Sequence, residues 1–128
     1  MTDNPDTMTN EELAQAWAEM MGWKLGKDFE PCRRMLPDVY YVLRGEFWCE
    51  IHDIGFSPST SWADFGITYE WMRGREWWAQ IWMMPEITRW AWCKGGFKGH
   101  GIAYVEEHDP DLRRASLVAG LKAEKEGK

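Results

Sequence analysis

The chain has 128 residues, a length that fits one domain and can bury a hydrophobic core without a metal or a disulfide. Its 21 Asp and Glu against 15 Lys and Arg give a formal net charge of -6, which disfavours duplex nucleic acid and anionic membrane surfaces as partners. The acidic N-terminus is unlike a secretory signal, and no apolar run reaches the roughly 18 residues that a membrane-spanning helix needs.

The first predicted element is a helix. Residues 1–8 show no periodic pattern, and we expect them to be flexible. Thr9 and Glu12 have the spacing of a capping box, and apolar residues then recur at helical spacing until Gly22, a natural helix stop. The sequence therefore predicts a helix over residues 10–21.

The next segment is less regular and contains prolines and glycines. Its two apolar pieces, Trp23–Leu25 and Val39–Leu43, predict one or two short strands in a long connection. Residues 46–54 alternate with the spacing of a strand. A Ser-x-x-Asp capping box that begins at Ser61 then predicts a second helix over about residues 61–73.

Three strands are predicted next, over Trp77–Met84, Ile87–Lys94 and Ile102–Glu107. Short connections between consecutive strands favour an antiparallel sheet. The first of these strands is apolar on both faces, and a strand of this kind is usually covered on both.

A last helix is predicted after Asp109, with this residue as N-cap and Pro110 at the first helical position. One domain then spans residues 9–122, and residues 123–128 form a charged C-terminal tail. The expected fold class is α+β, a three-layer α/β/α sandwich with a mainly antiparallel sheet.

Three patches of the sequence are similar, in order and spacing, to the phage ABA-sandwich domain. They are Leu13–Trp23 (LAQAWAEMMGW), Gly55–Trp62 (GFSPSTSW) and Asp111–Ala123 (DLRRASLVAGLKA). The resemblance implies a central sheet between helical layers and a bacteriophage or prophage origin, so that the protein would act in the cytoplasm of the infected bacterial host. It implies no activity and no catalytic residues.

Metal and catalytic motifs are weak in this sequence. The three cysteines are odd in number and lack C-x-x-C spacing, which favours a reducing cytoplasm and disfavours structural zinc. Cys49 and His52, with His100 or His108, would have to converge from separate strands to bind a metal. There is no G-x-S-x-G nucleophile motif. We expect no cofactor and no metal, and we favour a protein that is not an enzyme.

The glycine-rich segment Lys94–Gly101 has two interpretations. Its backbone N–H groups could form a phosphate nest, with Lys94, Lys98 and His100 adding charge. The segment lacks P-loop order and does not precede a helix, so a hairpin connection is the favoured interpretation.

Tryptophan is the unusual feature of the composition, with ten in 128 residues. So many large rings are difficult to hide in a small domain, and we expect some to be partly exposed. Arg and Lys occur near several of them, and this combination suits stacking on a base beside a phosphate or a protein–protein hot spot. The candidate ligand-binding residues are Trp78, Trp82, Trp90, Trp92, Arg75, Arg89, Lys94 and Lys98.

Two functional hypotheses follow from these residues. The first is a non-enzymatic phage accessory protein that holds a small molecule, such as a signalling nucleotide of the host, in a Trp-rich cleft bordered by Arg and Lys. The alternative is a protein–protein interaction module, either an inhibitor of a host protein or a homo-oligomer. An enzyme is the least supported class, because no residues can be named for it.

Overall fold

The computed structural model describes residues 4–28, 36–95 and 101–126. In chain order the elements are η1 (Pro5–Thr7), α1 (Asn10–Met20), β1 (Lys24–Leu25), η2 (Gly26–Asp28), β2 (Tyr40–Arg44), β3 (Phe47–Glu50), α2 (Trp62–Gly74), β4 (Trp77–Met84), β5 (Ile87–Gly95), β6 (Gly101–His108) and α3 (Leu112–Glu126). The predicted α+β class is confirmed, and the predicted helices and strands are present. The strand predicted over residues 46–54 is about half as long as expected: β3 ends at Glu50, and the chain then turns, with Ile54 N–H donating to the Glu50 carbonyl oxygen (3.1 Å).

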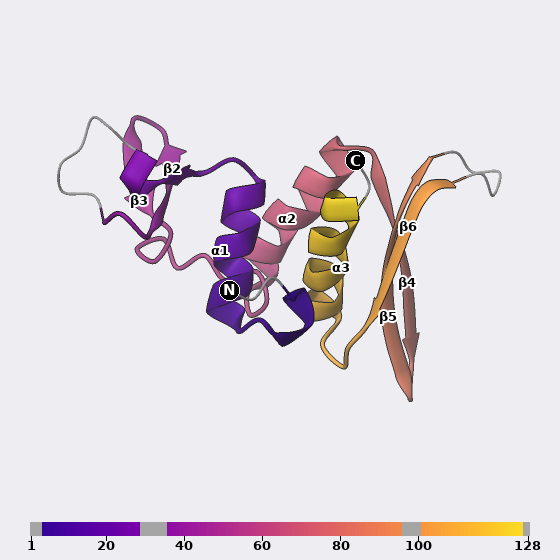
Figure 1. Cartoon of the computed structure of the whole chain (residues 1–128). Helices are drawn as coiled ribbons and strands as arrows, with labels where there is room; N and C mark the ends of the chain where they lie inside the picture. Colours follow the sequence, from indigo (N-terminus) through magenta and orange to yellow (C-terminus); the bar gives the residue numbers. More distant parts are fainter. Residues whose placement is uncertain (1–3, 29–35, 96–100, 127–128) are drawn as a thin grey trace.

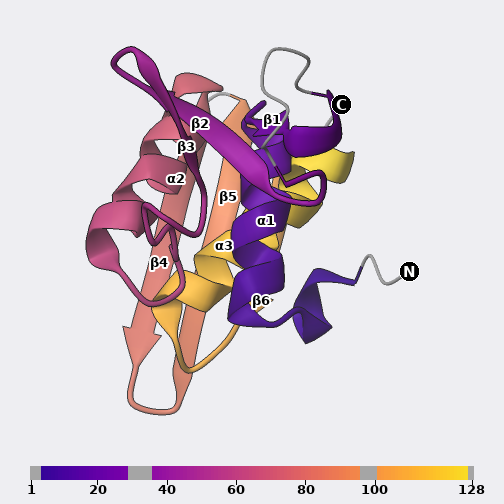
Figure 2. The ribbon, with the colours of Figure 1, turned by 90° about the vertical axis from the view of Figure 1, so that its left-hand side faces the viewer.

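The strands form two antiparallel sheets of three strands, in the orders β1-β2-β3 and β4-β5-β6. The helices lie between these sheets, with β2 and β3 beyond α1 and the larger sheet beyond α2 and α3 (Figure 1). In the view from the small sheet toward the large one, β2 and α1 lie in front of α3, and α3 lies in front of β5 (Figure 2).

The expected three-layer α/β/α sandwich is not confirmed. Helix α3 packs across β5 and β6 and α2 packs against β4, all on the same face of this sheet. The prediction assumed that a strand apolar on both faces must be covered on both. In β4 the outward-facing side chains Trp78 and Trp82 are instead paired with arginines on an uncovered face.

Helix α1 begins and ends as its sequence predicts. The Thr9 side chain accepts a hydrogen bond from the Glu12 backbone N–H (3.1 Å), and the Thr9 N–H donates to the Glu12 carboxylate (2.8 Å). Gly22 adopts a φ of 84°, which allows Trp23 N–H to donate to the carbonyl oxygen of Ala18 (3.0 Å) and closes the last turn.

Helix α3 begins two residues later than predicted. Asp111, rather than Asp109, is its N-cap, because the Asp111 side chain accepts from Arg113 N–H (2.9 Å) and its carbonyl accepts from Ala115 N–H (3.0 Å). The helix also extends through Glu126, so most of the predicted tail belongs to a folded element.

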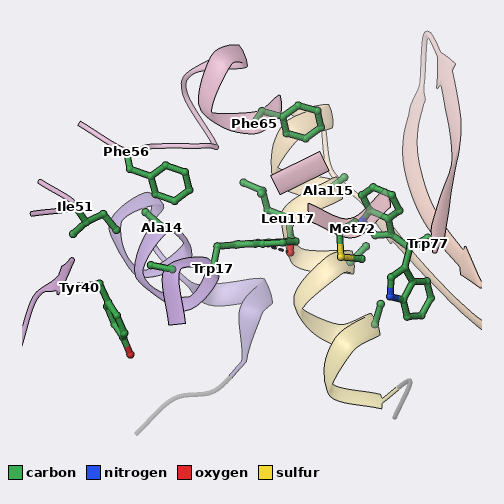
Figure 3. Close-up of a cluster of buried hydrophobic side chains, with 14 of the residues drawn as sticks. Ala14, Trp17, Tyr40, Ile51, Phe56, Phe65, Met72, Trp77, Ala115 and Leu117 are labelled. Atoms are coloured by element: carbon green, nitrogen blue, oxygen red, sulfur yellow. Dashed lines mark hydrogen bonds between the residues drawn. The ribbon is translucent and has the colours of Figure 1, made fainter. Parts of the chain in front are cut away.

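The core is built around α3. Trp17 Nε1 donates to the carbonyl oxygen of Leu117 (3.1 Å; Figure 3), and Trp92 Nε1 donates to that of Ser116 (3.1 Å). These two rings approach from α1 and from the large sheet, so α3 lies at the centre of the hydrophobic core. Among the described residues, no helix has the length and apolarity needed to cross a membrane.

Candidate functional site

The structure separates the predicted ligand-binding residues between the two faces of the large sheet. Trp90 and Trp92 point toward the helices and are 2% and 0% exposed. Trp90 packs edge-on against Phe65 and Tyr69, with ring centroids 5.5 and 6.2 Å apart. The assignment of Trp90 and Trp92 to a binding cleft is therefore corrected, because both indoles fill the core.

Trp78 and Trp82 point to the opposite face, which we call the open face. Strand alternation and register place these side chains on it: Trp78, Gln80, Trp82, Met84, Arg89, Ala91, Cys93, Glu106 and His108. No described helix packs on the open face (Figure 1). Trp78 is 45% exposed there and Trp82 is half-buried.

An arginine guanidinium lies over each of these two indole rings. The guanidinium of Arg89 lies 4.3 Å from the ring centre of Trp82, because the sheet register places the two residues directly opposite each other. The guanidinium of Arg73 lies 3.7 Å from the ring centre of Trp78. Arg73 was not among the predicted site residues, because it belongs to α2 and only the turn after that helix brings it to the open face.

A carboxylate joins the basic groups of the open face. Glu106 accepts from Arg89 Nη1 at 3.1 Å and lies 2.7 Å from His108 Nε2. Arg89 is thereby held both by its ion pair and by the Trp82 ring. The open face thus presents two aromatic rings, each with an arginine guanidinium already held over it.

The other predicted basic residues do not join the open face. Arg75 follows α2 and pairs with Glu124 of α3 (Nε to Oε1, 2.8 Å), with its guanidinium 4.9 Å from the Trp71 ring centre. Lys94 Nζ lies 5.1 Å from the ring centre of the buried Trp77. Lys98 lies outside the described residues.

A groove of about 700 Å³ opens among α1, α2 and α3. Its apolar lining is Pro5, Met8, Ala16, Met20, Trp71 and Leu121, and its charged lining is Glu19, Arg75, Glu124 and Lys125. Two carboxylates thus accompany two cations in the same groove. Trp71 and Arg75 give it the predicted Trp–Arg character, although only Arg75 was predicted. The apolar spacing along α2 gave no signal that the Trp71 ring would line a groove.

The structure gives little support to the metal and nucleophile alternatives. In the part of the chain that is described, no group of three or more His, Cys, Asp and Glu could hold a metal ion. Cys49 lies on β3 and His52 is exposed in the turn after it. Burial raises the pKa of the Cys93 thiol, which disfavours the reactive thiolate.

Strands β5 and β6 pair antiparallel up to Gly95 and Gly101, so the chain reverses between them as the hairpin interpretation predicts. Residues 96–100, on which the phosphate-nest alternative depends, lie outside the described residues.

Comparison with protein-family models, with curated proteins and with solved structures finds no match to this chain. The resemblance to the phage ABA-sandwich domain therefore stays a prediction.

Proposed function

We propose that this protein is a protein-recognition module that contacts another protein through the open face of the β4-β5-β6 sheet. The observation that carries the proposal is the pair of stacked Trp–Arg contacts, Trp78 with Arg73 and Trp82 with Arg89, on a sheet face that no described helix covers.

The residue types of the open face suit a protein partner. Trp and Arg are the residues most enriched at interface hot spots, and Met84 adds a flexible apolar side chain that is 59% exposed. A guanidinium that lies flat on an indole keeps N–H groups at its edge for a carboxylate. The partner expected is an apolar protein surface whose rim carries acidic side chains able to approach Arg73.

Affinity capture from a bacterial lysate, followed by binding measurements with the purified partner, tests the proposal. We expect Trp78→Ser and Trp82→Ser each to weaken binding by at least about tenfold, because truncation of a hot-spot aromatic costs about 2 kcal/mol or more. Phe47→Ser is the matched control, since Phe47 is 72% exposed on the other sheet. Capture of no protein, or equal binding by Trp82→Ser and the wild type, would overturn the proposal.

A small-molecule site is the second candidate function, and the groove among the three helices favours it. Its volume of about 700 Å³ is within the usual range of ligand pockets. A nucleotide is disfavoured, because Glu19 and Glu124 line the groove and Arg75 is already paired with Glu124 at 2.8 Å. A neutral or zwitterionic ligand with an aromatic or aliphatic part against Trp71 fits better.

Thermal unfolding with two ligand panels, nucleotides and neutral aromatic compounds, tests this second candidate. A ligand that binds the folded state raises the midpoint, and we expect the rise with the neutral panel only. Ala16→Met, which partly fills the groove, should abolish the rise in a folded protein. A midpoint unchanged by every compound would remove the candidate.

A further inference from the structure

The two edges of the large sheet differ in how they are protected. At one edge, β6 carries Glu106, Glu107 and His108, and its pairing with β5 has a register irregularity at Lys94/Gly95. Charges and bulges of this kind prevent edge strands from pairing with other chains. At the other edge, β4 reads WWAQIWMM, eight residues without a charge or a proline. Only one of the two edges is therefore blocked by its sequence.

Apart from Trp78, the exposed apolar residues of β4 lie toward its C-terminal end. Ile81 and Met83, on the helix side of the sheet, are 47% and 73% exposed, and Met84 on the open face is 59% exposed. The inward-facing Trp77 at the start of the strand is fully buried. The helices therefore cover the beginning of β4 on one face, and no described helix covers its second half on either face (Figure 1). Long, neutral, apolar edges of this kind favour strand pairing.

We propose that a second copy of this chain pairs with the edge of β4, antiparallel about Ile81, so that two three-stranded sheets become one of six strands. This pairing places Ile81 opposite Ile81 of the second copy, Ala79 opposite its Met83, and Trp78 opposite its Met84. The exposed methionines thereby gain apolar neighbours, and sulfur against an indole is a favourable contact.

The ends of the strand agree with this register. Trp77 would lie opposite Pro85 of the second copy, where the ladder has to stop because proline has no N–H to donate. The Trp77 carbonyl already accepts a hydrogen bond from Arg73 Nη1 at 3.0 Å. Neither residue is therefore needed in the ladder, and the pairing uses the segment from Ala79 to Met83.

The self-complementary register, rather than charge, favours a second copy over a strand of another protein. Each chain carries a net charge of -6, so association must occur through a surface without like charges in opposition. The paired segments themselves are neutral, and the nearest like charges in this register, Glu76 and Glu86 of the second copy, lie beyond the ends of the ladder. A twofold axis also makes the pattern complementary to itself, as in most closed dimers. The pairing does not rest on the proposed function, because it is made through the backbone edge of β4, although Trp78 and Met84 at its ends also belong to the open face.

Size-exclusion chromatography with light scattering on the full chain tests the dimer. We expect a mass near twice 15.1 kDa for the wild type and near 15.1 kDa for Ile81→Lys and Met83→Lys. Far-UV circular dichroism should be unchanged in both variants, because both side chains are exposed. The matched control, Phe47→Lys, should remain dimeric. A monomeric wild type, or dimeric lysine variants, would overturn the inference.

Disulfide cross-linking tests the register. In a chain whose three native cysteines are replaced by serine, Ile81→Cys should form a covalent dimer under mild oxidation, because opposed residues on antiparallel strands have Cα atoms about 4.5–5.5 Å apart. Met84→Cys should not, because it lies opposite Trp78. A Met84→Cys dimer without an Ile81→Cys dimer would overturn this register. Failure here leaves the open-face proposal intact, because that proposal is tested by the binding of a different protein and not by the mass or the cross-linking of this chain.

Discussion

At the scale of residues, the tryptophans divide by environment. Four are buried, and three of these donate their indole N–H to α3: Trp17 to Leu117, Trp92 to Ser116 and Trp77 to Glu124. Three others are exposed by more than a third: Trp48, Trp62 and Trp78. The expectation that some of the rings remain partly exposed is confirmed. A buried indole usually has an acceptor for its N–H, and α3 supplies three, while Trp90 Nε1 is buried without a partner among the described residues.

Gly120 is the residue that allows α3 to contact these rings. A Cβ atom at this position would overlap the Trp17 ring and would touch Trp92 Nε1. We expect Gly120→Ala to destabilise the protein by about 1 kcal/mol or more, because overpacking costs about 1–3 kcal/mol and the gain in helix propensity offsets only about 1. Urea denaturation measures the change in the free energy of unfolding.

The matched control is Gly66→Ala in α2, where a Cβ atom meets nothing within 4 Å. This substitution should stabilise the protein by about 0.5–1 kcal/mol, because helix propensity then acts alone. Equal effects of the two substitutions would contradict the role assigned to Gly120.

At the scale of elements, the last turn of α3 is part of the core. Ala123 and Glu124 are 0% and 8% exposed, although the sequence marks residues 123–128 as a charged tail. The Glu124 carboxylate accepts from Trp77 Nε1 at 2.6 Å and pairs with Arg75. A charged residue in a terminal segment is usually solvated, and only the packing of α3 against the large sheet beside α2 gives this carboxylate its partners.

Truncation tests this assignment. A chain that ends at Lys122 should lose roughly 2–4 kcal/mol of stability, because it leaves Trp77 Nε1 buried without an acceptor and uncovers apolar surface. A chain that ends at Lys125 keeps both buried residues and should unfold at nearly the wild-type urea midpoint. If the two truncated chains unfold at the same urea midpoint, the tail is dispensable, as its charged sequence suggests.

At the scale of the whole molecule, the N-terminal segment is fastened to α3. Arg114 donates to the backbone carbonyls of Asp6 and Met8, and Lys122 Nζ lies 2.8 Å from Asp6 and 2.7 Å from Glu107. The hydrogen bond from Lys122 holds the pKa of Asp6 below its ordinary value. Burial raises the pKa of Glu107. Burial by itself would lower the pKa of Lys122, but the two acidic partners Asp6 and Glu107 raise it above its ordinary value.

These pKa shifts predict the pH dependence of Lys122→Met. Asp6, with a lowered pKa, contributes stability that is present above pH 3.8 and is lost as the pH falls through its folded pKa. Without Lys122, both acids are charged and unpaired at pH 7. At pH 7 we expect Lys122→Met to be less stable than the wild type by on the order of 1 kcal/mol, a modest deficit because solvent screens the half-exposed Asp6. This deficit should shrink below about pH 4 as both acids protonate.

Urea denaturation of the wild type and of Lys122→Met at pH 7 and pH 3 measures this deficit. Lys125→Met, which removes an exposed cation three positions later in the same helix, should show no such difference between the two pH values. A deficit of the same size at both pH values would show that Lys122 acts through packing rather than charge.

The sequence by itself determined most of the local structure. The capping box at Thr9, the stop at Gly22 and the apolar run over Trp77–Met84 depend on neighbouring residues only, and each predicted its element closely. The antiparallel pairing of the last three strands also followed from their short connections. The prediction that some indoles stay exposed needed only a count of large rings in a small domain.

The tertiary structure decided which surfaces are exposed. Alternation assigns Trp77 and Trp78 to opposite faces of the sheet, but it does not say which face the helices cover. The contact of Arg73 with Trp78 and that of Glu124 with Trp77 join residues whose distance in space depends on how α2 and α3 pack. Burial is a property of the assembled layers, so the candidate surfaces could be located only after the helices and sheets were placed together.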